Sequence, residues 1–551
     1  MKKILYVSIF MLCALLMVAC DKDYSFSLDV DNVSKLRESI VYDLTLNDKD
    51  DELKKSEVKG EITKKDSKTV LSTKVVSFST ESKTATVEFK NLTSDTEYTV
   101  VFYVGYDGKK VELYNSDKDE TEALKTSAQG TKEDPYSVAT VDDFTNIVKK
   151  DPSGHFKLAN DIDFGGKSIS PLFTSSKPFT GTFDGNEKTI SNFKLSSTNS
   201  ATNEATHSSQ SSQYYGLFGY IGTDGLVSNL KLNAFDIMVK RSTTSESHYG
   251  LLAGYCAGEV TNVHVTNSKF NVKSEQTGVD KFNVGGLIGK LTSTGKVSNV
   301  SVKADITVYS AKDATVGGVV ANTAGAVIME NKAENASYAF ISNISNATFE
   351  GNIVVSLSGV NNEDSQTSVA SQTSIGGVVG NNYSAVVTSC NSKGKISLTS
   401  DFTTVGAQGL TLGGVVGKNQ NANGIVKDCT SNMEFYVKTM DVPAKADESK
   451  EEEQKIININ VGLLVGVNKG VVNSCSYTKP ETATTYEIHV NNGENKDYVQ
   501  STIGVIAKSL SEYENNVVSN SAVTFVKVLY KFENNVYTEE SRVNFDTIAA
   551  A

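Results

Sequence analysis

The chain has 551 residues, with 53 basic and 65 acidic side chains and a formal net charge of −12. This acidic balance, without a basic patch, excludes nucleic acid as an expected partner. The chain has no tryptophan, which argues against the usual aromatic platform for carbohydrate, although tyrosine can take that place. Low charge content with abundant Ser, Thr, Asn, Gly and Val is typical of a secreted, β-rich protein.

Residues 1–19 have the pattern of a secretory signal. Lys2 and Lys3 precede an apolar run, Ile4 to Leu16, that is too short for a lasting transmembrane helix. The sequence Leu16-Met17-Val18-Ala19-Cys20 resembles the lipobox of bacterial lipoproteins. That resemblance implies that Cys20 becomes the mature N-terminus and carries acyl chains, which would anchor the protein in a membrane. The alternative is an ordinary secretory signal followed by an incidental cysteine.

A short acidic segment, Asp21-Lys22-Asp23, follows the cysteine. It resembles the surface-export signal of Bacteroidota lipoproteins, which implies an outer-membrane protein exposed at the cell surface. A lipoprotein that faces the periplasm is the alternative. Residues 20–27 are then a lipidated tether.

Residues 28–131 are predicted to form an antiparallel β-sandwich. Val76 to Ser79 and Thr84 to Phe89 alternate apolar and polar residues around a turn at Glu81 to Lys83. Leu124 to Ser127 would be the closing strand.

One stretch of this domain carries a family resemblance. Leu92 to Val100 resembles the Leu-x-x-x-Thr-x-Tyr-x-Val sequence of fibronectin type III and related Ig-like sandwiches. The resemblance implies that the Tyr98 hydroxyl bonds to the backbone and fixes a corner. The expected role of the domain is a spacer, with an intrinsic binding role as the alternative.

A short helix is expected after the linker Gly130 to Pro135. Thr140 to Asp143 has the character of a capping box, with Asp143 in place of the usual Glu. The apolar residues that follow at helical spacing share one face: Val141, Phe144, Ile147 and Val148. We expect this helix to cover the end of the next domain, where unpaired strand edges would otherwise be exposed.

A glycine-rich phrase then recurs along residues 135–525. It starts at Gly216, Gly250, Gly285, Gly317, Gly376, Gly413, Gly462 and Gly504, with spacings of 34, 35, 32, 59, 37, 49 and 42 residues. A unit of this length predicts a stacked solenoid, with the variation in length confined to loops. The glycine pair would serve a tight bend or a close backbone approach. Two insertions, Ser196 to Gln213 and Asp441 to Lys455, are predicted to be solvated, and the acidic one lacks the spacing of a calcium loop.

The opening of this domain also resembles a known family. The sequences NDIDF at Asn160 to Phe164, FTGTFDGNEKTI at Phe179 to Ile190, and GLFG at Gly216 to Gly219 resemble bacterial β-helix proteins with GLUG motifs. The resemblance covers about Tyr136 to Val526 and implies a right-handed parallel β-helix. The chain departs from the pattern at Glu187-Lys188, where Gly-His is common, and we interpret this as a loop substitution.

The second half of each repeat aligns in three columns. In a β-helix, side chains that point inward at the same position of successive coils would stack on similar side chains at the strand spacing of about 4.8 Å. The middle, inward column is Leu230, Val263, Val300, Ile344, Cys390, Cys429 and Cys475. The first column, expected at a left-handed bend, is Asn229, Asn262, Asn299, Asn343, Ser389, Asp428 and Ser474. The third, outward column is Lys231, His264, Ser301, Ser345, Asn391, Thr430 and Ser476.

The four cysteines of this domain are Cys256, Cys390, Cys429 and Cys475. They lack the CxxC spacing of zinc sites. The last three are predicted to be a buried ladder of small apolar side chains, because stacked side chains that face one way do not suit disulfide geometry. Disulfides are the alternative, and the redox state of all four stays open.

No catalytic constellation is apparent. A glycosidase needs two carboxyl groups a few ångströms apart, and the outward column holds none. Asp161, Asp163 and Asp184 are interpreted as turn or cap residues, and the five histidines have no metal spacing. His248 and His264 could approach across one coil, where a satisfied surface pair is expected. Val523 to Phe545 is predicted to form a closing hairpin, within a cap or tail over residues 526–551.

The sequence therefore predicts an all-β protein, a right-handed parallel β-helix preceded by an Ig/Fn3-like sandwich. The expected function is that of a surface-anchored, adhesin-like lipoprotein that presents loops to a host or glycan ligand, without metal or cofactor. A β-helix polysaccharide lyase or glycosidase and an accessory subunit of an outer-membrane assembly are the alternatives. The ligand-binding residues, the ligand and the oligomeric state stay open.

Overall fold

The computed structural model describes residues 24–53, 56–119, 123–195, 205–207, 214–241, 246–274, 281–310, 313–324, 343–357, 372–400, 408–439, 457–480, 486–491, 499–511, 515–520, 523–533 and 536–548. The chain divides into two compact units, Met1–Ala128 and Gln129–Ala551. Each unit has its own cluster of buried apolar residues. No helix within the described ranges is long and apolar enough to cross a membrane.

Unit 1 contains two antiparallel sheets, as expected for the predicted β-sandwich. One sheet contains β1 (Phe26–Lys35), β2 (Ile40–Asp48) and β5 (Thr84–Phe89). The other contains β4 (Val70–Val75), β3 (Val58–Lys64), β6 (Tyr98–Tyr106) and β7 (Lys109–Asn115), followed by the short helix α1 (Ser116–Asp119). Buried aromatic rings join the sheets, with 5.2 Å between the ring centroids of Tyr42 and Phe102.

The predicted corner of this sandwich is confirmed. The backbone N–H of Thr93 donates to the Tyr98 hydroxyl at 2.8 Å, and the ring of Tyr98 is buried. The hydroxyl of Thr126 donates to the Thr93 carbonyl oxygen at 2.7 Å, which ties the same corner to the end of the domain.

Two strand predictions in unit 1 were wrong. Val76 to Ser79 forms no strand, because β4 pairs with β3 and β5 pairs with β2, so the chain between β4 and β5 passes from one sheet to the other. Leu124 to Ser127 makes only an isolated bridge between Glu97 and Lys125, and β7 occupies the edge of the sheet. In both segments the local alternation reflects burial against a sheet rather than membership of it.

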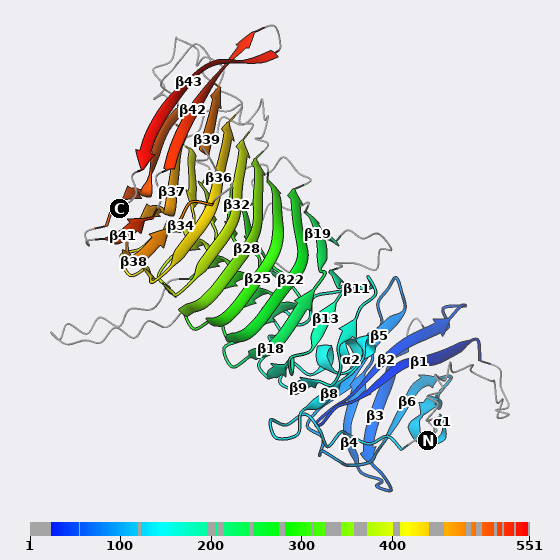
Figure 1. Cartoon of the computed structure of the whole chain (residues 1–551). Coiled ribbons are helices and arrows are strands. Elements are labelled where there is room, and N and C mark those ends of the chain that lie inside the picture. Colours follow the sequence, from blue (N-terminus) through cyan, green and yellow to red (C-terminus); the bar gives the residue numbers. More distant parts are fainter. Residues whose placement is uncertain are drawn as a thin grey trace, which may run out of the picture. The chain divides into compact units, whose positions relative to one another are not determined.

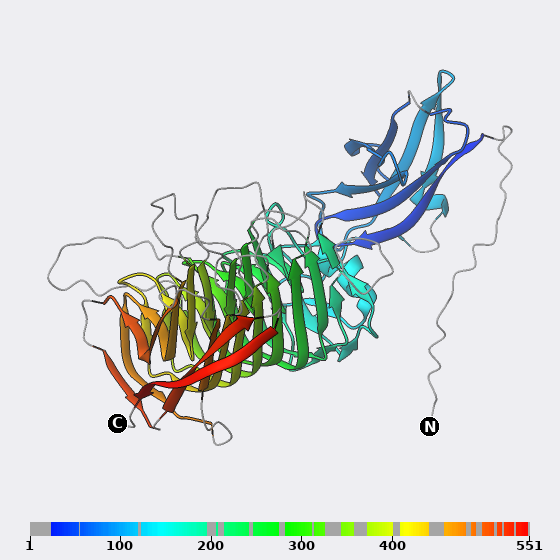
Figure 2. The same cartoon turned by 90° about the horizontal axis from the view of Figure 1, so that it is seen from above.

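Unit 2 is a parallel β-helix, which confirms the predicted solenoid (Figure 1). Each central coil contributes two short strands to a 14-stranded sheet and a long strand to a 20-stranded sheet, and the coils stack along one axis (Figure 2). One coil, for example, contains β23 (Lys281–Gly285), β24 (Ile288–Leu291) and β25 (Lys296–Ser310).

The other strands of the 14-stranded sheet repeat this pattern. The first strands of each coil are β16 (Tyr214–Tyr215), β20 (Ser247–Gly250), β26 (Asp313–Gly317), β29 (Gln372–Gly376) and β33 (Gln408–Gly413). The second strands are β17 (Phe218–Ile221), β21 (Ala253–Cys256), β27 (Val320–Thr323), β30 (Val379–Asn382) and β34 (Val416–Asn419). β37 (Ile457–Asn468) continues through both positions, and β40 (Val499–Ser509) pairs with it.

The 20-stranded sheet contains the remaining strands of unit 2, apart from the small pair β11 (Ser168–Ile169) and β14 (Lys194–Leu195). Its early strands are β8 (Tyr136–Val138), β9 (His155–Leu158), β10 (Ile162–Asp163), β12 (Thr182–Asp184), β13 (Thr189–Ser191), β15 (Ala205–His207), β18 (Leu226–Asn233), β19 (Asp236–Arg241) and β22 (Glu259–Ser274). Its later strands are β28 (Asn343–Leu357), β31 (Val386–Thr388), β32 (Asn391–Ser400), β35 (Ile425–Lys427), β36 (Thr430–Thr439), β38 (Val471–Tyr477), β39 (Tyr486–Asn491), β41 (Asn516–Ser519), β42 (Val523–Glu533) and β43 (Val536–Ile548).

The glycine repeat sets the register of the 14-stranded sheet. Gly285 pairs with Gly317, Gly317 with Gly376, and Gly376 with Gly413, although their spacings in the sequence differ. The extra residues therefore lie outside the paired strands, as predicted. The first glycine serves a close approach rather than a positive φ, because a Cβ at Gly317 would overlap the carbonyl oxygen of Val320.

The left-handed bend is also confirmed, with one correction. Asn229, Asn262 and Asn299 each have a φ of 53°, and Ser389, Asp428 and Ser474 have φ values of 52° to 53°. In the intervening coil the bend residue is Asn346 (φ 51°) rather than Asn343, because Val300 pairs with Ala347. The corrected columns therefore contain Asn346, Ala347 and Thr348. An asparagine stands at both positions, and only strand pairing distinguishes them.

The late cysteines form the predicted inward ladder. Cys390, Cys429 and Cys475 are buried and free, as is Cys256. The backbone N–H of Cys390 donates to the Cys429 sulfur at 3.4 Å, and that of Cys429 donates to the Cys475 sulfur at 3.4 Å. Each of these contacts joins a cysteine to the cysteine of the next coil in the stack.

A second internal ladder was not predicted. Asn382, Asn419 and Asn468 are completely buried, and each side-chain amide donates to the next along the stack, at 3.0 and 2.8 Å. Their Nδ2 atoms also donate to backbone carbonyl oxygens in the adjacent turns, for example Asn419 to Gly424 at 3.0 Å. The amide ladder thus provides hydrogen-bond donors for carbonyl oxygens in the turns that would otherwise be buried without partners.

The predicted capping helix is α2 (Val141–Asn146), followed by the 3-10 turn η1 (Val148–Lys150). Thr140 Oγ1 accepts from the Asp143 N–H, and Asp143 Oδ2 accepts from the Thr140 N–H, which completes the capping box. Phe144 is buried against Phe164 and Phe183, with ring centroids 5.3 and 6.1 Å away. The helix therefore covers the first coils of the core.

The closing hairpin is confirmed at the other end. β42 and β43 pair antiparallel, from Val523 with Ile548 to Glu533 with Val536. β42 also continues the parallel stack through β39. The insertion Asp441 to Lys455 lies outside the described residues, as does Ser196 to Gln213 apart from residues 205–207.

Candidate functional site

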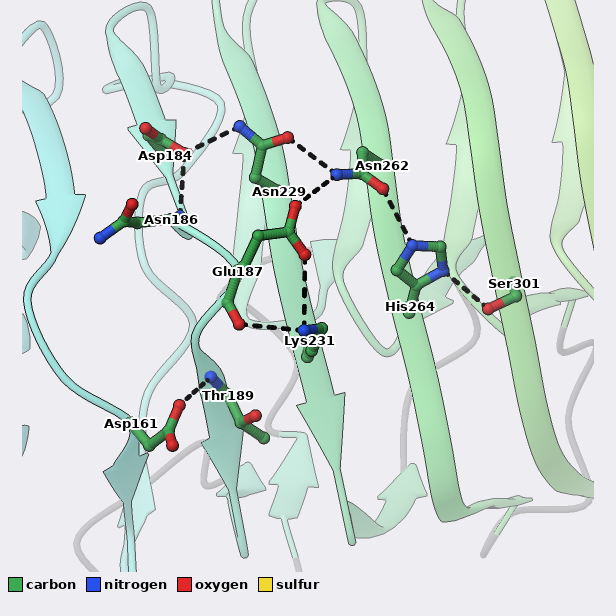
Figure 3. Close-up of polar contacts among 10 residues, drawn as sticks. All are labelled: Asp161, Asp184, Asn186, Glu187, Thr189, Asn229, Lys231, Asn262, His264 and Ser301. Atoms are coloured by element: carbon green, nitrogen blue, oxygen red, sulfur yellow. Dashed lines mark hydrogen bonds and ion pairs between the residues drawn. The ribbon is translucent and has the colours of Figure 1, made fainter.

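The first candidate is an outer polar network on the 20-stranded sheet, formed by the side chains drawn in Figure 3. It extends from β12 and β13 across β18 and β22 to β25. It includes Lys231, His264 and Ser301 of the outward column, and two aspartates of the opening motif, Asp161 and Asp184, lie at one end of it.

Those aspartates have the turn roles that were predicted. Asp161 accepts from the N–H of Thr189 at 2.7 Å, and Asp184 accepts from the N–H of Asn186 at 2.9 Å. Asp163 accepts from the N–H of Gly165 at 2.7 Å and from the side chain of Asn192 at 2.8 Å. The hydrogen bond from Asn192, and next that from Gly165, hold the pKa of Asp163 below its usual value.

Glu187 stands out in this network because of its backbone. Its φ is 58°, a left-handed conformation that costs a non-glycine residue about 1–2 kcal/mol. Its carboxylate ion-pairs with Lys231 Nζ at 3.4 Å and accepts from Asn262 Nδ2 at 2.7 Å. The departure from the GLUG pattern therefore places a carboxylate beside a lysine on the adjacent strand.

Asparagine and histidine extend the network along the coils. Asn229 donates to Asp184 at 3.0 Å, and Asn262 donates to Asn229 at 2.9 Å. The ring of His264 lies between the Ser301 hydroxyl, at 2.8 Å, and Asn262 Oδ1, at 2.9 Å. The outward polar column is thus a brace between neighbouring coils.

The expected pair of histidines is not formed. His264 lies on β22 in the 20-stranded sheet, whereas His248 lies on β20 in the 14-stranded sheet. His248 is buried and stacks on Tyr214, with ring centroids 5.3 Å apart. The two histidines are only 16 residues apart in the sequence, and the sequence alone did not show that their strands belong to different sheets.

The chemistry of the outer network is limited by its own bonds. The carboxylates of Asp161, Asp163 and Asp184 accept backbone N–H groups, and that of Glu187 binds Lys231 and Asn262. No group of three or more potential metal-ligating side chains occurs within the described ranges. The network therefore links neighbouring coils structurally, and it contains one exposed ion pair, between Glu187 and Lys231.

The second candidate is the outward side of the 14-stranded sheet, which the sequence reasoning missed. Two columns of side chains in register define it, and we call them together the Tyr-Asn-Lys face. The first column is Tyr214, His248, Asn283, Thr315, Ser374, Thr411 and Asn460. The second column is Tyr220, Tyr255, Lys290, Asn322, Asn381, Lys418 and Val467.

Aromatic rings occupy one end of this face. Tyr220 and Tyr255 stack with ring centroids 4.1 Å apart, and Tyr214 makes edge contacts with both, at 5.6 and 5.0 Å. All three tyrosines are half-buried. Burial is the main cause of the raised pKa of Tyr214 and Tyr220, so their hydroxyls stay protonated at neutral pH.

Amides continue the face, and they join its two columns. Asn322 Nδ2 donates to Asn283 Oδ1 at 3.4 Å, and Asn381 Nδ2 donates to Asn322 Oδ1 at 3.2 Å. The signal in the sequence was the last letter of each glycine phrase, which reads Tyr, Tyr, Lys, Asn, Asn and Lys from GLFGY to GGVVGK. Only the register shows that these letters form one line.

Comparisons with known proteins match parts of the chain. Residues 282–307, which contain most of one coil, match the family model described as the GLUG motif. Two curated relatives match part of the chain. A putative Gly-rich membrane protein of Evansella cellulosilytica is 31% identical over 28% of this chain and 17% of its own length. The halomucin of Haloquadratum walsbyi is 28% identical over 31% of this chain and 2% of its own length.

The chain thus spans less than a fifth of either relative. Among solved structures, an IgA1 protease matches 83% of this chain and 30% of its own length, with 12% identity and a TM-score of 0.35.

Proposed function

We propose that the protein is a lipid-anchored, surface-exposed, adhesin-like binding module of a bacterial outer membrane. Cys20 would carry the lipid, unit 1 would serve as an Fn3-like spacer, and the β-helix would present the ligand-binding surface. The two relatives, a putative membrane protein and a halomucin, support a location in the cell envelope. The lipobox and the acidic segment after it support the anchor and the surface exposure.

The observation that carries the binding role is the constant register of coils with unequal lengths. Between the ends of β22, β28, β32 and β36 and the starts of β23, β29, β33 and β37, the chain adds 6, 14, 7 and 17 residues without shifting the glycine pairs. All these insertions depart from the same corner of the coil, beside the first column of the Tyr-Asn-Lys face. The chain also adds 19 residues between the end of β27 and the start of β28, at another corner. A rigid scaffold with variable segments at its corners is typical of a recognition surface.

The anchor is tested by replacing Cys20. Cys20→Ser should move the protein from the membrane fraction to the soluble fraction and abolish labelling with a palmitate analogue. Replacement of Asp21 and Asp23 by Asn should leave the lipid in place and reduce labelling of intact cells by an impermeant reagent. If Cys20→Ser stays in the membrane with unchanged labelling, the lipid anchor is wrong.

The binding role is tested with the whole chain carrying Cys20→Ser, on arrays of glycans and host surface proteins. Reproducible, saturable binding of one ligand class is the expected result. Absence of binding on both arrays would contradict the proposed binding function. Stable co-purification of the lipidated protein with an outer-membrane complex would favour the accessory-subunit alternative instead.

One observation favours a second candidate function, a glycan lyase or hydrolase. An outward carboxylate, Glu187 in the turn between β12 and β13, lies beside the ammonium group of Lys231 on β18, and the backbone of Glu187 has a left-handed conformation. Incubation with a panel of polysaccharides should then release unsaturated or reducing products. Glu187→Gln should abolish that release, whereas Lys303→Gln, at another outward ion pair with Glu350, should not.

A further inference from the structure

We propose that the second column of the Tyr-Asn-Lys face, together with Tyr214, is the ligand-binding surface of the β-helix and that its ligand is an anionic polysaccharide lying along the stack of coils. Most of the first column is buried, whereas the residues of the second column up to Lys418 are half-buried. This inference deepens the proposed binding function and rests on it. It is carried by the charge of the face, by its polar groups without partners, and by its repeat.

The charge of the face differs from that of the whole chain. The protein has an excess of acidic residues, yet neither column contains an Asp or a Glu. Lys290 and Lys418 lie in the second column and have no carboxylate partner within the described residues. Two acids border the first column rather than the second: Glu246 accepts from Asn283 at 2.9 Å and lies 3.8 Å from His248 Nε2, and Asp313 precedes Thr315 by two residues on β26.

The positive charge of Lys418 is not balanced by a carboxylate within the described residues. Its burial, and next the positive charge of Lys469, lower its pKa. A half-buried ammonium group without an anion is unfavourable, because desolvation and like charge both act against the charged form. The carboxylate or sulfate group of a ligand would supply the missing charge, with a charge-assisted hydrogen bond.

Hydroxyl-rich ligands suit the rest of the face. Asn381 Oδ1 is buried and accepts no hydrogen bond within the described part of the chain, although its Nδ2 donates to Asn322. Asn381 as a whole is half-buried, and a rotation of its side chain that exposes this oxygen would let a sugar hydroxyl donate to it. The tyrosine rings at the other end offer apolar surface together with hydroxyl groups.

The spacing of the face favours a polymer over a small molecule. Successive coils are about 4.8 Å apart, so Lys290 and Lys418, three coils apart, lie about 14 Å from each other along the axis. No single small anion can reach both. A chain with repeated acidic groups can contact both lysines and the amides between them.

The test uses the whole chain carrying Cys20→Ser and measures binding of polygalacturonate, dextran sulfate, neutral dextran and polyglutamate by calorimetry. We expect one of the two acidic polysaccharides to bind, with affinity that falls as salt rises, and neutral dextran not to bind. Lys290→Gln and Lys418→Gln should each weaken binding roughly tenfold, as expected for the loss of a hydrogen bond to a charged group. Lys303→Gln, on the other sheet, is the matched control and should bind as the unmodified protein does.

The tyrosines separate a polysaccharide from an acidic protein. Tyr220→Ala with Tyr255→Ala should weaken polysaccharide binding, while circular dichroism shows that the β-helix is intact. Polyglutamate binding as tight as that of the polysaccharides, or an equal loss in Lys303→Gln, would overturn the inference. If the arrays show a ligand whose affinity is unchanged in both lysine variants, the proposed binding surface is wrong, but the proposed binding function is retained.

Discussion

At the scale of the residue, the left-handed bend explains why Asn, Ser and Asp recur at one position in seven successive coils. An L-residue with φ near 53° brings its Cβ close to the following carbonyl, and the short polar side chains tolerate this conformation best. Asn299 shows the added benefit, because its Oδ1 accepts from Asn346 Nδ2 of the next coil at 3.1 Å.

The bend at Asn299 provides a test of backbone strain. Asn299→Ala and Asn299→Gly both remove the hydrogen bond to Asn346, but only alanine has a Cβ in the left-handed conformation. Asn299→Ala should therefore lower the free energy of unfolding by about 1 kcal/mol more than Asn299→Gly does. Urea denaturation of the three proteins measures the difference, and equal stability of the two variants would refute the role of the bend.

The buried cysteines should be unreactive in the folded protein. Burial raises the pKa of Cys256 to about 12, and the hydrogen bonds within the ladder raise the pKa of Cys429 and Cys475. A thiol reagent at pH 8 should modify none of these three before denaturation and all of them afterwards. Rapid modification of Cys429 or Cys475 in the native protein would contradict the ladder, and rapid modification of Cys256 would contradict its burial.

The same pKa values predict a loss of stability at alkaline pH. The folded protein keeps the Cys256 proton up to about pH 12, whereas the unfolded chain releases it near pH 9. The free energy of unfolding should therefore fall as pH rises from 9 towards 12. Cys256→Ala should reduce that slope, measured by urea denaturation at several pH values. Since tyrosines and lysines also titrate there, only the difference between the two slopes is informative.

At the scale of the element, the sequence was reliable where a motif satisfies itself locally. The capping box of α2 needs only Thr140 and Asp143, three residues apart, and both of its hydrogen bonds are present. Val76 to Ser79 and Leu124 to Ser127 have a strand-like pattern, but each makes too few backbone hydrogen bonds with a neighbouring strand to extend a sheet; the Val76 N–H, for example, donates to the Val58 carbonyl oxygen at 2.9 Å. Strand pairing depends on the position of other strands, so local alternation was insufficient there.

The cap of α2 offers a measurable contribution to stability. Thr140→Ala removes the acceptor for the Asp143 N–H and should lower the free energy of unfolding of unit 2 by about 1 kcal/mol. Thr145→Ala is the control, because Thr145 is an exposed residue of the same helix whose hydroxyl bonds only locally. Equal effects of the two substitutions in urea denaturation would show that the cap is unimportant.

At the scale of the whole molecule, two separate cores imply two units of unfolding. The apolar cluster of unit 1 and that of unit 2 share no residue. Val378 is completely buried in the middle of the β-helix, and Phe102 is completely buried in the sandwich.

Substitutions in the two cores should therefore act independently. Val378→Asp buries a charge without a partner and should destabilise unit 2 by more than about 4 kcal/mol, while the transition of unit 1 stays in place. Phe102→Ala should lower the stability of unit 1 by about 3–5 kcal/mol and leave unit 2 unchanged. Calorimetry resolves the two transitions, and a common shift of both in either variant would contradict their independence.

The sequence by itself determined the architecture of this protein, because a coil that stacks on its own copy repeats its glycines, its bend and its inward residues. Motif and period were therefore sufficient for the β-helix, the capping helix, the cysteine ladder and the turn roles of Asp161, Asp163 and Asp184. Tertiary structure alone decided between Asn343 and Asn346, and it separated His248 from His264. It also brought Tyr220, Tyr255, Lys290 and Lys418 into one line, because residues far apart in the chain become neighbours only through strand register.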